Sequence, residues 1–199
     1  MSKLIVGLDE AGRGCLLGRV YSAAVIYTGD FENLPFKVNS WDSKKISKKK
    51  REVLFDWIKE NADFHAISYA DEKIIDDVNI LQATQQTFHE NLDKLNICSK
   101  NHKIVVDGNY FRAYIDKDGN FVEYICVPQG DDKFHEVGMA SILAKVAHDK
   151  YIEELIAENP YLEKYDLTKN VGYGTKKHRD ALKENGYTEF HRKSFKLKK

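Results

Sequence analysis

The stretch KLIVGLDEAGRG, residues 3–14, indicates how this chain folds. Its apolar and β-branched first half is typical of a strand, and the glycines at its end favour a turn. A second apolar run, residues 19–27, follows after a few residues. We therefore expect two neighbouring strands, the first of which ends on the adjacent acids Asp9 and Glu10.

The rest of the chain alternates between strand-like and helical patterns. Five strands among helices indicate an α/β sheet core over residues 1–159, and residues 160–199 are expected to form a small helical appendage that begins at Pro160. A break is expected near Asn79 within the second helix. The later strands are expected at 64–70, 103–107 and 121–127, and the helices at 47–62, 71–95, 133–158 and 174–186.

The composition is that of one soluble globular unit, or of one domain with an added terminal segment. The chain has 199 residues, of which 42% are hydrophobic and 31% charged, and this balance argues against disorder, collagen and coiled coil. Its three scattered cysteines are too few for a disulfide framework or a zinc knuckle, which favours a reducing compartment. We find neither the ~18 consecutive apolar residues of a membrane span nor a signal peptide, so we expect a soluble, cytoplasmic protein.

A formal net charge of zero conceals two basic blocks. Lys+Arg and Asp+Glu number 31 each, but residues 37–52 hold seven basic and two acidic side chains, and residues 175–199 hold nine and three. These blocks carry +5 and +6, so the remaining residues carry −11. Such segregation indicates a basic binding surface and an acidic pocket elsewhere. A solvated helix face and a charged tail would produce the same pattern.

Acidic residues follow three of the expected strands: Asp9 and Glu10, then Asp107, then Asp131 and Asp132. Ligands of open α/β sheets bind beyond strand ends, so these carboxylates can converge there. Oxygen ligands without nearby histidine or cysteine select Mg²⁺ or Mn²⁺, and four acids favour two metals about 3.5–4 Å apart, as in phosphoryl displacement. Adjacent strand residues point to opposite faces, so the first two acids share a site only if the strand ends between them. Alternatively, each acid is a turn residue or a helix cap.

The glycines of residues 12–18 allow two interpretations. Their G-x-G-x-x-x-G spacing is one residue too long for a dinucleotide fingerprint, so a nucleotide-binding oxidoreductase has little support. Small residues can bring backbone N–H groups close to a phosphate or a sugar, and Arg13 adds a guanidinium for an anionic oxygen. A tight turn between the two strands is the structural alternative.

These residues lie within motifs that resemble those of a known family, ribonuclease HII. The motifs follow the family's order between residues 7 and 195, so chance does not account for them. They are Gly7 to Gly14 with Gly18; Asp42 to Ser47; Val106 to Gly108; Gly130-Asp131 with Ala140 to Val146 and Asp149; and Gly172 to Thr175 with His178, Gly186 and His191 to Phe195.

The resemblance implies an RNase H-like fold, with a mixed five-stranded sheet flanked by helices, and a type II ribonuclease H with a two-metal mechanism. Such an enzyme hydrolyses the RNA strand of RNA–DNA hybrids. It also nicks duplex DNA at a single embedded ribonucleotide, on the 5′ side of the RNA–DNA junction, and leaves a 3′-hydroxyl and a 5′-phosphate. The residues that it implies for catalysis and for binding Mg²⁺ or Mn²⁺ are Asp9, Glu10, Asp107 and Asp131.

The resemblance also implies how substrate is held, with the helical appendage, residues 160–199, contributing to binding. The backbone of Gly12, Arg13 and Gly14 would contact the 2′-hydroxyl, the group that separates RNA from DNA locally. Tyr173 would pack against the neighbouring deoxyribose. The implied phosphate contacts, which are independent of sequence, are Lys44, Lys45 and Arg192.

One helix face presents Ser141, Lys145 and Asp149 together, because they recur every four residues. Asp149 either orients Lys145 or a metal-bound water, or it forms a plain ion pair worth about 0.3–0.5 kcal/mol. His178 and His191 lie in the second basic block, where substrate contact and surface exposure are both open. The aromatic residues expected in the core are Phe31, Phe36, Trp57, Phe64 and Phe88.

Several positions depart from the family's pattern. Gln129 stands where lysine is usual, His148 where arginine is usual, and Cys15 where proline is usual. A rival hypothesis is therefore a nucleic-acid-binding module that has lost turnover, but all four carboxylates are present. We expect a monomeric enzyme of DNA replication and repair, with hybrid and ribonucleotide-containing duplexes as its partners and no membrane association.

Overall fold

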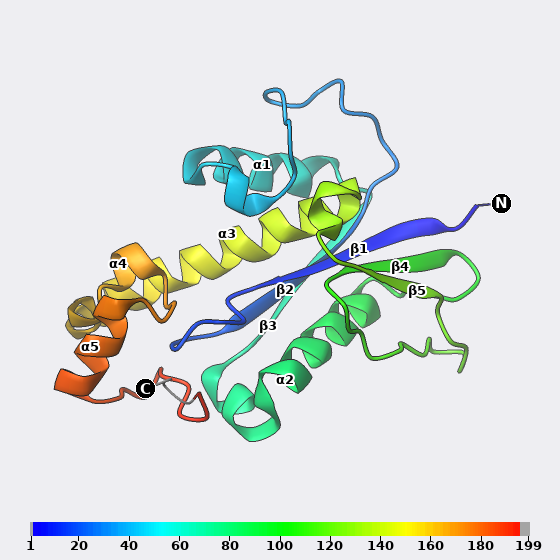
Figure 1. Ribbon diagram of the computed structural model, residues 1–199. Coiled ribbons are helices and arrows are strands. Elements are labelled where there is room, and N and C mark those ends of the chain that lie inside the picture. The colour runs from blue at the N-terminus through cyan, green and yellow to red at the C-terminus, as the bar shows by residue number, and fades with distance from the viewer. Residues whose placement is uncertain (1, 196–199) are drawn as a thin grey trace.

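The computed structural model describes residues 2–195, and a mixed five-stranded sheet lies at its centre (Figure 1). The strand order is β3-β2-β1-β4-β5. β1 pairs antiparallel with β2 and β2 with β3, whereas β1 and β4, and β4 and β5, are parallel. The expected mixed sheet is confirmed. Its strands are β1 (Leu4–Ala11), β2 (Val20–Ile26), β3 (Phe64–Ala70), β4 (His102–Asp107) and β5 (Tyr124–Val127).

Helices cover both faces of this sheet. In Figure 1, α1 and α3 lie on one face and α2 on the other. The α-helices are α1 (Lys48–Asn61), α2 (Glu72–Lys94), α3 (His135–Glu158), α4 (Leu167–Asn170) and α5 (Lys176–Asn185), and the 3₁₀ helices are η1 (Ser43–Lys45), η2 (Gly130–Asp132) and η3 (Pro160–Tyr165).

Residues of β1 point alternately to these two layers. Val6 and Leu8 are fully buried in the core shared with α2. Gly7 faces α3, and a Cβ atom there would lie 2.2 Å from the carbonyl carbon of Glu136. Because Gly7 has no side chain, α3 packs directly on β1. Residues of α3 therefore lie close to the acids that follow Leu8.

The break expected in the second helix is present at Asn79. This residue has φ 68° and ψ 161°, outside the helical region, within α2. Its side-chain oxygen accepts hydrogen bonds from the backbone N–H groups of Leu81 and Gln82, at 3.0 and 3.1 Å. Asn79 therefore caps the second part of the helix while interrupting the first.

Most of the expected core aromatics are buried or packed against the core, but Phe64 is not. Phe64 is 58% exposed, and it is the first residue of β3, a strand at the edge of the sheet. Trp57 and Phe88 lie in the two main cores, and Phe31 and Phe36 pack against the first of these. The expectation for Phe64 is wrong.

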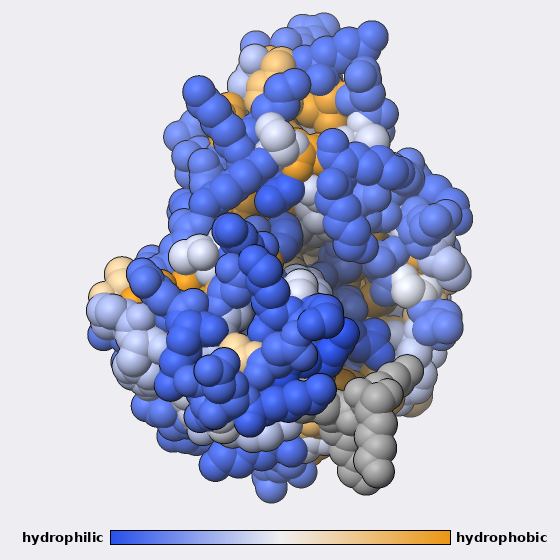
Figure 2. Space-filling view, turned by 60° about the vertical axis from the view of Figure 1, so that its left-hand side comes forward, coloured by the Kyte–Doolittle hydropathy of each residue, from blue (hydrophilic) through white to orange (hydrophobic). Residues whose placement is uncertain are grey.

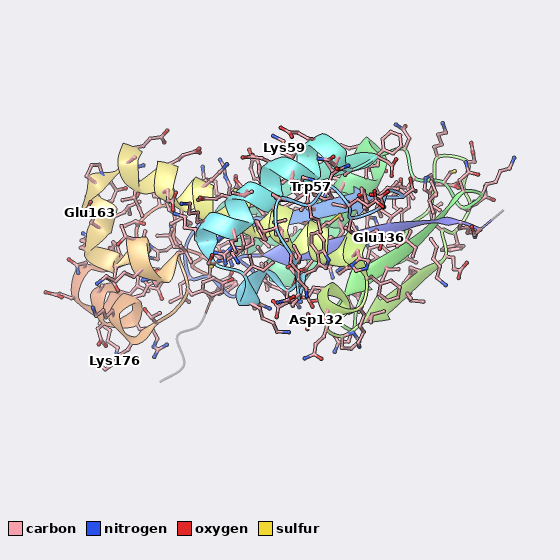
Figure 3. The ribbon with its side chains drawn as sticks, turned by 90° about the horizontal axis from the view of Figure 1, so that it is seen from above. Trp57, Lys59, Asp132, Glu136, Glu163 and Lys176 are labelled. Atoms are coloured by element: carbon pink, nitrogen blue, oxygen red, sulfur yellow. The ribbon has the colours of Figure 1, made fainter. Side chains whose placement is uncertain are left out.

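The segment after α3 packs on the far end of that helix around a separate small core. This core joins Ile152 and Leu155 of α3 to Leu162, Tyr165 and residues of α5. Glu163 and Lys176 lie at one end of the molecule, whereas Asp132 and Glu136 lie toward its middle (Figure 3). Lys196–Lys199, the end of the second basic block, lie outside the described residues.

The face that carries this segment is mainly hydrophilic, with apolar residues exposed only in scattered places (Figure 2). Among the described residues, no helix combines the length and the apolar composition needed to cross a bilayer.

Candidate active site

Three of the predicted carboxylates meet at one cavity of about 320 Å³. They are Asp9 and Glu10 of β1 and Asp107 at the end of β4. Basic and hydroxyl side chains complete the wall, so charges of both signs face the same space. The residues that line the cavity are Asp9, Glu10, Ala11, Ser43, Lys44, Asp107, Ser141, Lys145 and Tyr173.

The sheet register brings the first and third of these acids together. Leu8 pairs with Val106 in the parallel β1–β4 ladder, so Asp9 and Asp107 are the next residues on adjacent strands. β1 does not end between Asp9 and Glu10, contrary to the condition set for their sharing a site; it continues to Ala11, paired with β2 alone. Two-stranded ribbons twist more strongly than wide sheets, and this twist can turn both side chains toward one cavity.

Asp131 reaches this region from a different element. It lies in η2. Gln129 directly precedes this 3₁₀ helix, and its φ of 58° turns the chain sharply after β5. The backbone N–H of Gly130 donates to Oδ1 of Asp107 at 2.8 Å, which ties η2 to the end of β4. Asp131 is buried beside the cavity but is not part of its wall.

The carboxylates repel one another electrostatically. Burial raises the pKa of Asp9 well above its usual range, and the charges of Glu10 and Asp107 raise it further. Burial also raises the pKa of Glu10, against the opposing charge of Arg13. The pKa of Asp131 is raised by burial and then by the charge of Asp107. Burial and mutual repulsion therefore outweigh the nearby positive charges of Arg13 and Lys44 at these carboxylates.

Among residues 2–195, no group of three or more His, Cys, Asp or Glu side chains is arranged to hold a metal ion as it stands. The chemistry of the donors nevertheless fits one. Carboxylate oxygens are hard ligands suited to Mg²⁺ or Mn²⁺, and a divalent cation would relieve the repulsion that raises the pKa values of Asp9, Glu10 and Asp131. The carboxylate side chains would have to move closer together to hold it.

Behind the carboxylates, Asp149 forms the centre of a network on α3. Its carboxylate accepts from Lys145 Nζ at 2.8 Å and from His148 Nδ1 at 3.1 Å, and Arg51 lies at 3.5 Å. Burial alone would raise the pKa of Asp149, but the hydrogen bonds from His148 and Lys145 outweigh it and lower that pKa. Lys145 lines the cavity, and its ammonium group is held in place by Asp149. Ser141, on the same helix face, also lines the cavity, and its hydroxyl donates to Ser43 Oγ at 3.0 Å. The hydroxyl of Ser141 lowers the pKa of Asp9.

The two lysines predicted to contact phosphates lie in different settings. Lys44 lines the carboxylate cavity. Lys45 forms ion pairs with Asp132 and Asp42, so its charge is already partnered by η2 and by the residue before η1. Arg13, at 3.4 Å from Glu10, is half-exposed at the rim.

We call residues 12–19, which join β1 to β2, the glycine loop. It is not a tight turn, because its backbone pairs with two segments of the C-terminal region. Leu16 N–H donates to the Gly172 carbonyl at 2.8 Å, and Gly18 N–H to the Phe190 carbonyl at 2.8 Å. Tyr173 lies beside the loop: a Cβ atom on Gly14 would lie 3.7 Å from its ring.

Arg192 does not occupy the position expected of a phosphate-binding residue. It is fully buried, and its guanidinium donates to the carbonyl oxygens of Gly18 at 2.8 Å and Arg13 at 3.0 Å. Burial lowers the pKa of Arg192 to about 10. The expected phosphate contact is corrected to a structural one: Arg192 holds both halves of the glycine loop.

Two of the departures from the family's pattern touch each other. Cys15 Sγ lies 3.5 Å from Nε2 of His148, and the other ring nitrogen of His148 faces Asp149. This order resembles a Cys-His-Asp triad. Both the thiol and the imidazole are fully buried, however, and burial raises the pKa of Cys15 to about 12, so the thiol remains protonated. The contact holds the glycine loop against α3, where Gly12 leaves room for the His148 ring.

The sequence profile described as Ribonuclease HII matches residues 6–198. Ribonuclease HII of Bacteroides thetaiotaomicron is 40% identical over 191 residues, which span 96% of this chain and 88% of that protein. This chain belongs to the ribonuclease HII family. It is a type II ribonuclease H, a hydrolase of the RNA strand in RNA–DNA hybrids.

Solved structures agree on the RNase H-like fold. Ribonuclease HII from Archaeoglobus fulgidus, solved in a complex with PCNA, superposes with a TM-score of 0.75 at 24% identity, over 98% of this chain and 96% of that one. Bst-RNase HIII, solved with Mn²⁺, gives 0.66 at 18% identity, over 93% of this chain and 63% of that one.

Sequence reasoning missed several residues that support this ribonuclease HII site. Arg51 falls within a basic run that reads as a solvated helix face, yet its guanidinium is largely buried and bonds the Ser43 carbonyl at 3.0 Å. Asp42 caps η1 by accepting from Lys44 N–H at 2.9 Å, a role that its place before a helix could have indicated. His178 and His191 are neither exposed nor beside the carboxylate cavity; both are fully buried.

Proposed function

We propose that this ribonuclease HII, besides acting on RNA–DNA hybrids, nicks duplex DNA at a single embedded ribonucleotide, on the 5′ side of the RNA–DNA junction. One observation supports this specificity. The carboxylates Asp9, Glu10 and Asp107 line the same cavity as Tyr173, and the glycine loop lies directly beside that tyrosine. The carboxylates proposed for phosphodiester hydrolysis are therefore adjacent to the groups proposed to contact the sugar.

The divalent cations, Mg²⁺ or Mn²⁺, would be held by Asp9, Glu10, Asp107 and Asp131. When bound, a pair of such ions supplies an activated water and stabilises charge on the phosphate oxygens. The Mn²⁺ found in Bst-RNase HIII supports this choice of metal. Lys145 and Lys44, on the cavity wall, would orient the scissile phosphate by its charge. The products would carry a 3′-hydroxyl and a 5′-phosphate.

The glycine loop would read the 2′-hydroxyl through the backbone of Gly12, Arg13 and Gly14, where small residues permit close approach. Tyr173 is partly exposed at the cavity edge, and its ring would pack against the deoxyribose that follows the ribonucleotide. We assign catalysis to residues 1–159 and substrate binding to the appendage, residues 160–199, with which the glycine loop pairs. We further propose a monomer that works in the cytoplasm during DNA replication and repair.

The direct test is cleavage of an end-labelled DNA duplex with one ribonucleotide, with Mg²⁺, with Mn²⁺ and with EDTA. We expect a single nick on the 5′ side of the junction, abolished by EDTA, and cleavage of a uniform RNA–DNA hybrid in parallel. Binding without any cleavage in either metal would instead support a module without turnover. Cleavage of the hybrid alone would refute the proposed junction specificity.

A further inference from the structure

Two buried histidines form a hydrogen-bonded pair that neither the carboxylate site nor the fold's main cores account for. His178 lies in the first turn of α5, and His191 lies in the segment after that helix. Their Nε2 atoms are 3.1 Å apart, and neither residue has any exposed surface. The Tyr165 ring packs against both, with centroids 4.8 Å from His191 and 5.9 Å from His178.

The hydrogen-bond partners at the two ends of this histidine pair determine which ring nitrogens carry protons. At one end, the backbone N–H of Thr188 points to Nδ1 of His191 at 3.0 Å. An N–H group can only donate, so Nδ1 is bare and the neutral ring carries its proton on Nε2. That proton must be donated to Nε2 of His178. The proton of His178 is then on Nδ1, which faces the carbonyl of Tyr173 at 3.1 Å.

The other end requires the same direction independently. A carbonyl oxygen can only accept, so the Tyr173 carbonyl also calls for a proton on Nδ1 of His178. The two rings therefore have opposite tautomers, and reversing either one would leave two lone pairs or two N–H groups facing each other. Burial lowers the pKa of both histidines, that of His191 to about 4, which keeps the pair neutral.

The carbonyl that receives this hydrogen bond belongs to a strained turn. Val171 and Gly172, directly before Tyr173, have φ values of 43° and 88°. Left-handed backbone is unfavourable for a β-branched residue such as Val171 and persists only where the surroundings hold it. Thr175 N–H also donates to the Tyr173 carbonyl, at 2.8 Å, and the Thr175 hydroxyl caps α5. The turn is thus held from the α5 side by a donor of defined direction.

We propose that the His191–His178 pair is a positioning device for Tyr173, in which His191 fixes the tautomer of His178 and His178 fixes the tyrosine's main chain. The ring of Tyr173 consequently stays at the edge of the carboxylate cavity, beside Lys145 and the glycine loop. This inference rests on the proposed function, in which Tyr173 contacts the deoxyribose at the junction. Neither histidine touches substrate, so both are positioning residues.

The first test is independent of activity. Nitrogen-15 NMR of the histidine-labelled protein, assigned with His178→Asn and His191→Gln, distinguishes protonated from bare ring nitrogens. We expect His178 to carry its proton on Nδ1, His191 to carry its proton on Nε2, and a coupling between the two Nε2 nuclei across the hydrogen bond. A proton on Nε2 of His178 would overturn the proposal.

The second test uses two variants of similar chemistry. The amide nitrogen of His178→Asn can stand where Nδ1 stands and keep the bond to Tyr173. In His178→Gln the amide oxygen can stand where Nε2 stands and accept from His191, but the Tyr173 carbonyl loses this donor. For each we would measure kcat and KM on the single-ribonucleotide duplex and on the uniform hybrid. We expect His178→Gln to lower kcat/KM on the single-ribonucleotide duplex about tenfold relative to kcat/KM on the uniform hybrid. His178→Asn should preserve this ratio.

His191 gives the matching pair. His191→Leu removes the Nε2–H donor and frees His178 to adopt the other tautomer, so the ratio should fall about as far as in His178→Gln. His191→Gln keeps a donor at that position and should retain the ratio. Circular dichroism and melting of every variant identify those that fail to fold, and the conservative variants carry the test in that case.

Failure of this inference is distinguishable from failure of the proposed function. Tyr173→Ala serves as the reference, because it removes the ring itself. If Tyr173→Ala changes the ratio and a folded His178→Gln does not, the positioning role is refuted and the junction specificity stands. If Tyr173→Ala leaves the ratio unchanged, the proposed role of the tyrosine is refuted and the positioning proposal falls with it.

Discussion

The carboxylate cavity and the glycine loop lie next to each other, but the chain holds them in different ways. The acids stand on the backbone of the sheet, where the register of β1 and β4 places Asp9 beside Asp107. The glycine loop is held by buried groups from the far end of the sequence, above all Arg192. The carboxylates are thus placed by the register of paired strands, whereas the glycine loop is placed by backbone and side-chain contacts from the C-terminal region.

The largest effect should come from the carboxylate side of this comparison. We predict that Asp107→Asn or Asp131→Asn lowers turnover by orders of magnitude with little loss of duplex binding. In the first variant the amide oxygen can still accept from Gly130 N–H, so η2 stays in place while a charged ligand is lost. Single-turnover kinetics and a binding isotherm measure the two quantities separately.

Asp118→Asn is the matched control, since this exposed acid lies in the turn before β5, away from the cavity. It should behave as the parent does. Cleavage by Asp107→Asn at the parent rate would show that Asp107 is not part of the active site.

The glycine loop should respond in stability as well as in activity. Arg192→Met leaves the carbonyls of Gly18 and Arg13 without their donor, and the loss outweighs the relief of a desolvated charge. We expect about 2 kcal/mol of destabilisation and a higher KM. Denaturant unfolding with Lys193→Gln as control measures the first effect, because Lys193 is the exposed neighbour.

A surface arginine that binds phosphate would behave differently. Its loss would reduce the salt dependence of substrate binding and leave the free energy of unfolding nearly unchanged. If Arg192→Met gave both of these results, Arg192 would be a phosphate contact, although its burial argues against that role.

Acid should loosen the region around His191 before it affects the sheet. The pKa of His191 is lowered to about 4 from an ordinary value near 6.5, because burial and His178 disfavour its charge and Glu189 only partly offsets them. The unfolded chain therefore binds a proton between pH 6.5 and 4 that the folded chain does not, so stability is complete above pH 6.5 and falls as the pH falls through that window. The other titratable groups packed around the pair are Tyr165 and Tyr187.

The measurement is the difference in unfolding free energy between the parent and His191→Gln at pH 7.5 and 5.5. We expect the parent to lose about 1 kcal/mol more than the variant, a value reduced for solvent screening. Taking this difference cancels the opposite contribution of Asp9, Glu10 and Asp131, whose raised pKa values favour the folded state in acid. Equal losses in both proteins would contradict the prediction.

The smallest effect concerns Cys15 and His148, which join the two regions. A double-mutant cycle with Cys15→Ala and His148→Gln should give a coupling energy of about 0.5–1 kcal/mol, as expected for side chains in contact. Additive losses would show that the contact between the two departures contributes nothing. Thermal or denaturant unfolding of the four proteins is sufficient.

The sequence predicted well what local patterns determine. Alternation and turn residues located all five strands, and an Asn within a helical pattern indicated the break at residue 79. Asp9, Glu10 and Asp107 were placed at one site because strand ends meet at a sheet edge, and the structure does bring them to one cavity. Their role as metal ligands, with Asp131, stays a prediction.

What local patterns do not determine was predicted poorly. Nothing near Arg192 in the sequence reveals that the carbonyls of Arg13 and Gly18 approach it, so a basic residue in a basic block reads as a surface group. The same reasoning leaves His178 and His191 undecided between two exposed roles, although both are buried. Burial of such residues depends on contacts that span most of the chain, and only the folded structure supplies them.

The contact between Arg192 and Gly18 also has a consequence for synthesis, because it spans 174 positions. During translation the strands that carry the acids can pair long before residue 192 leaves the ribosome, since domains fold as the chain emerges. The glycine loop gains this donor only after residue 192 has emerged. A nascent polypeptide that stops short of residue 192 would therefore possess the acidic cluster without an anchored glycine loop, so the acids take their places before the loop beside them is fixed.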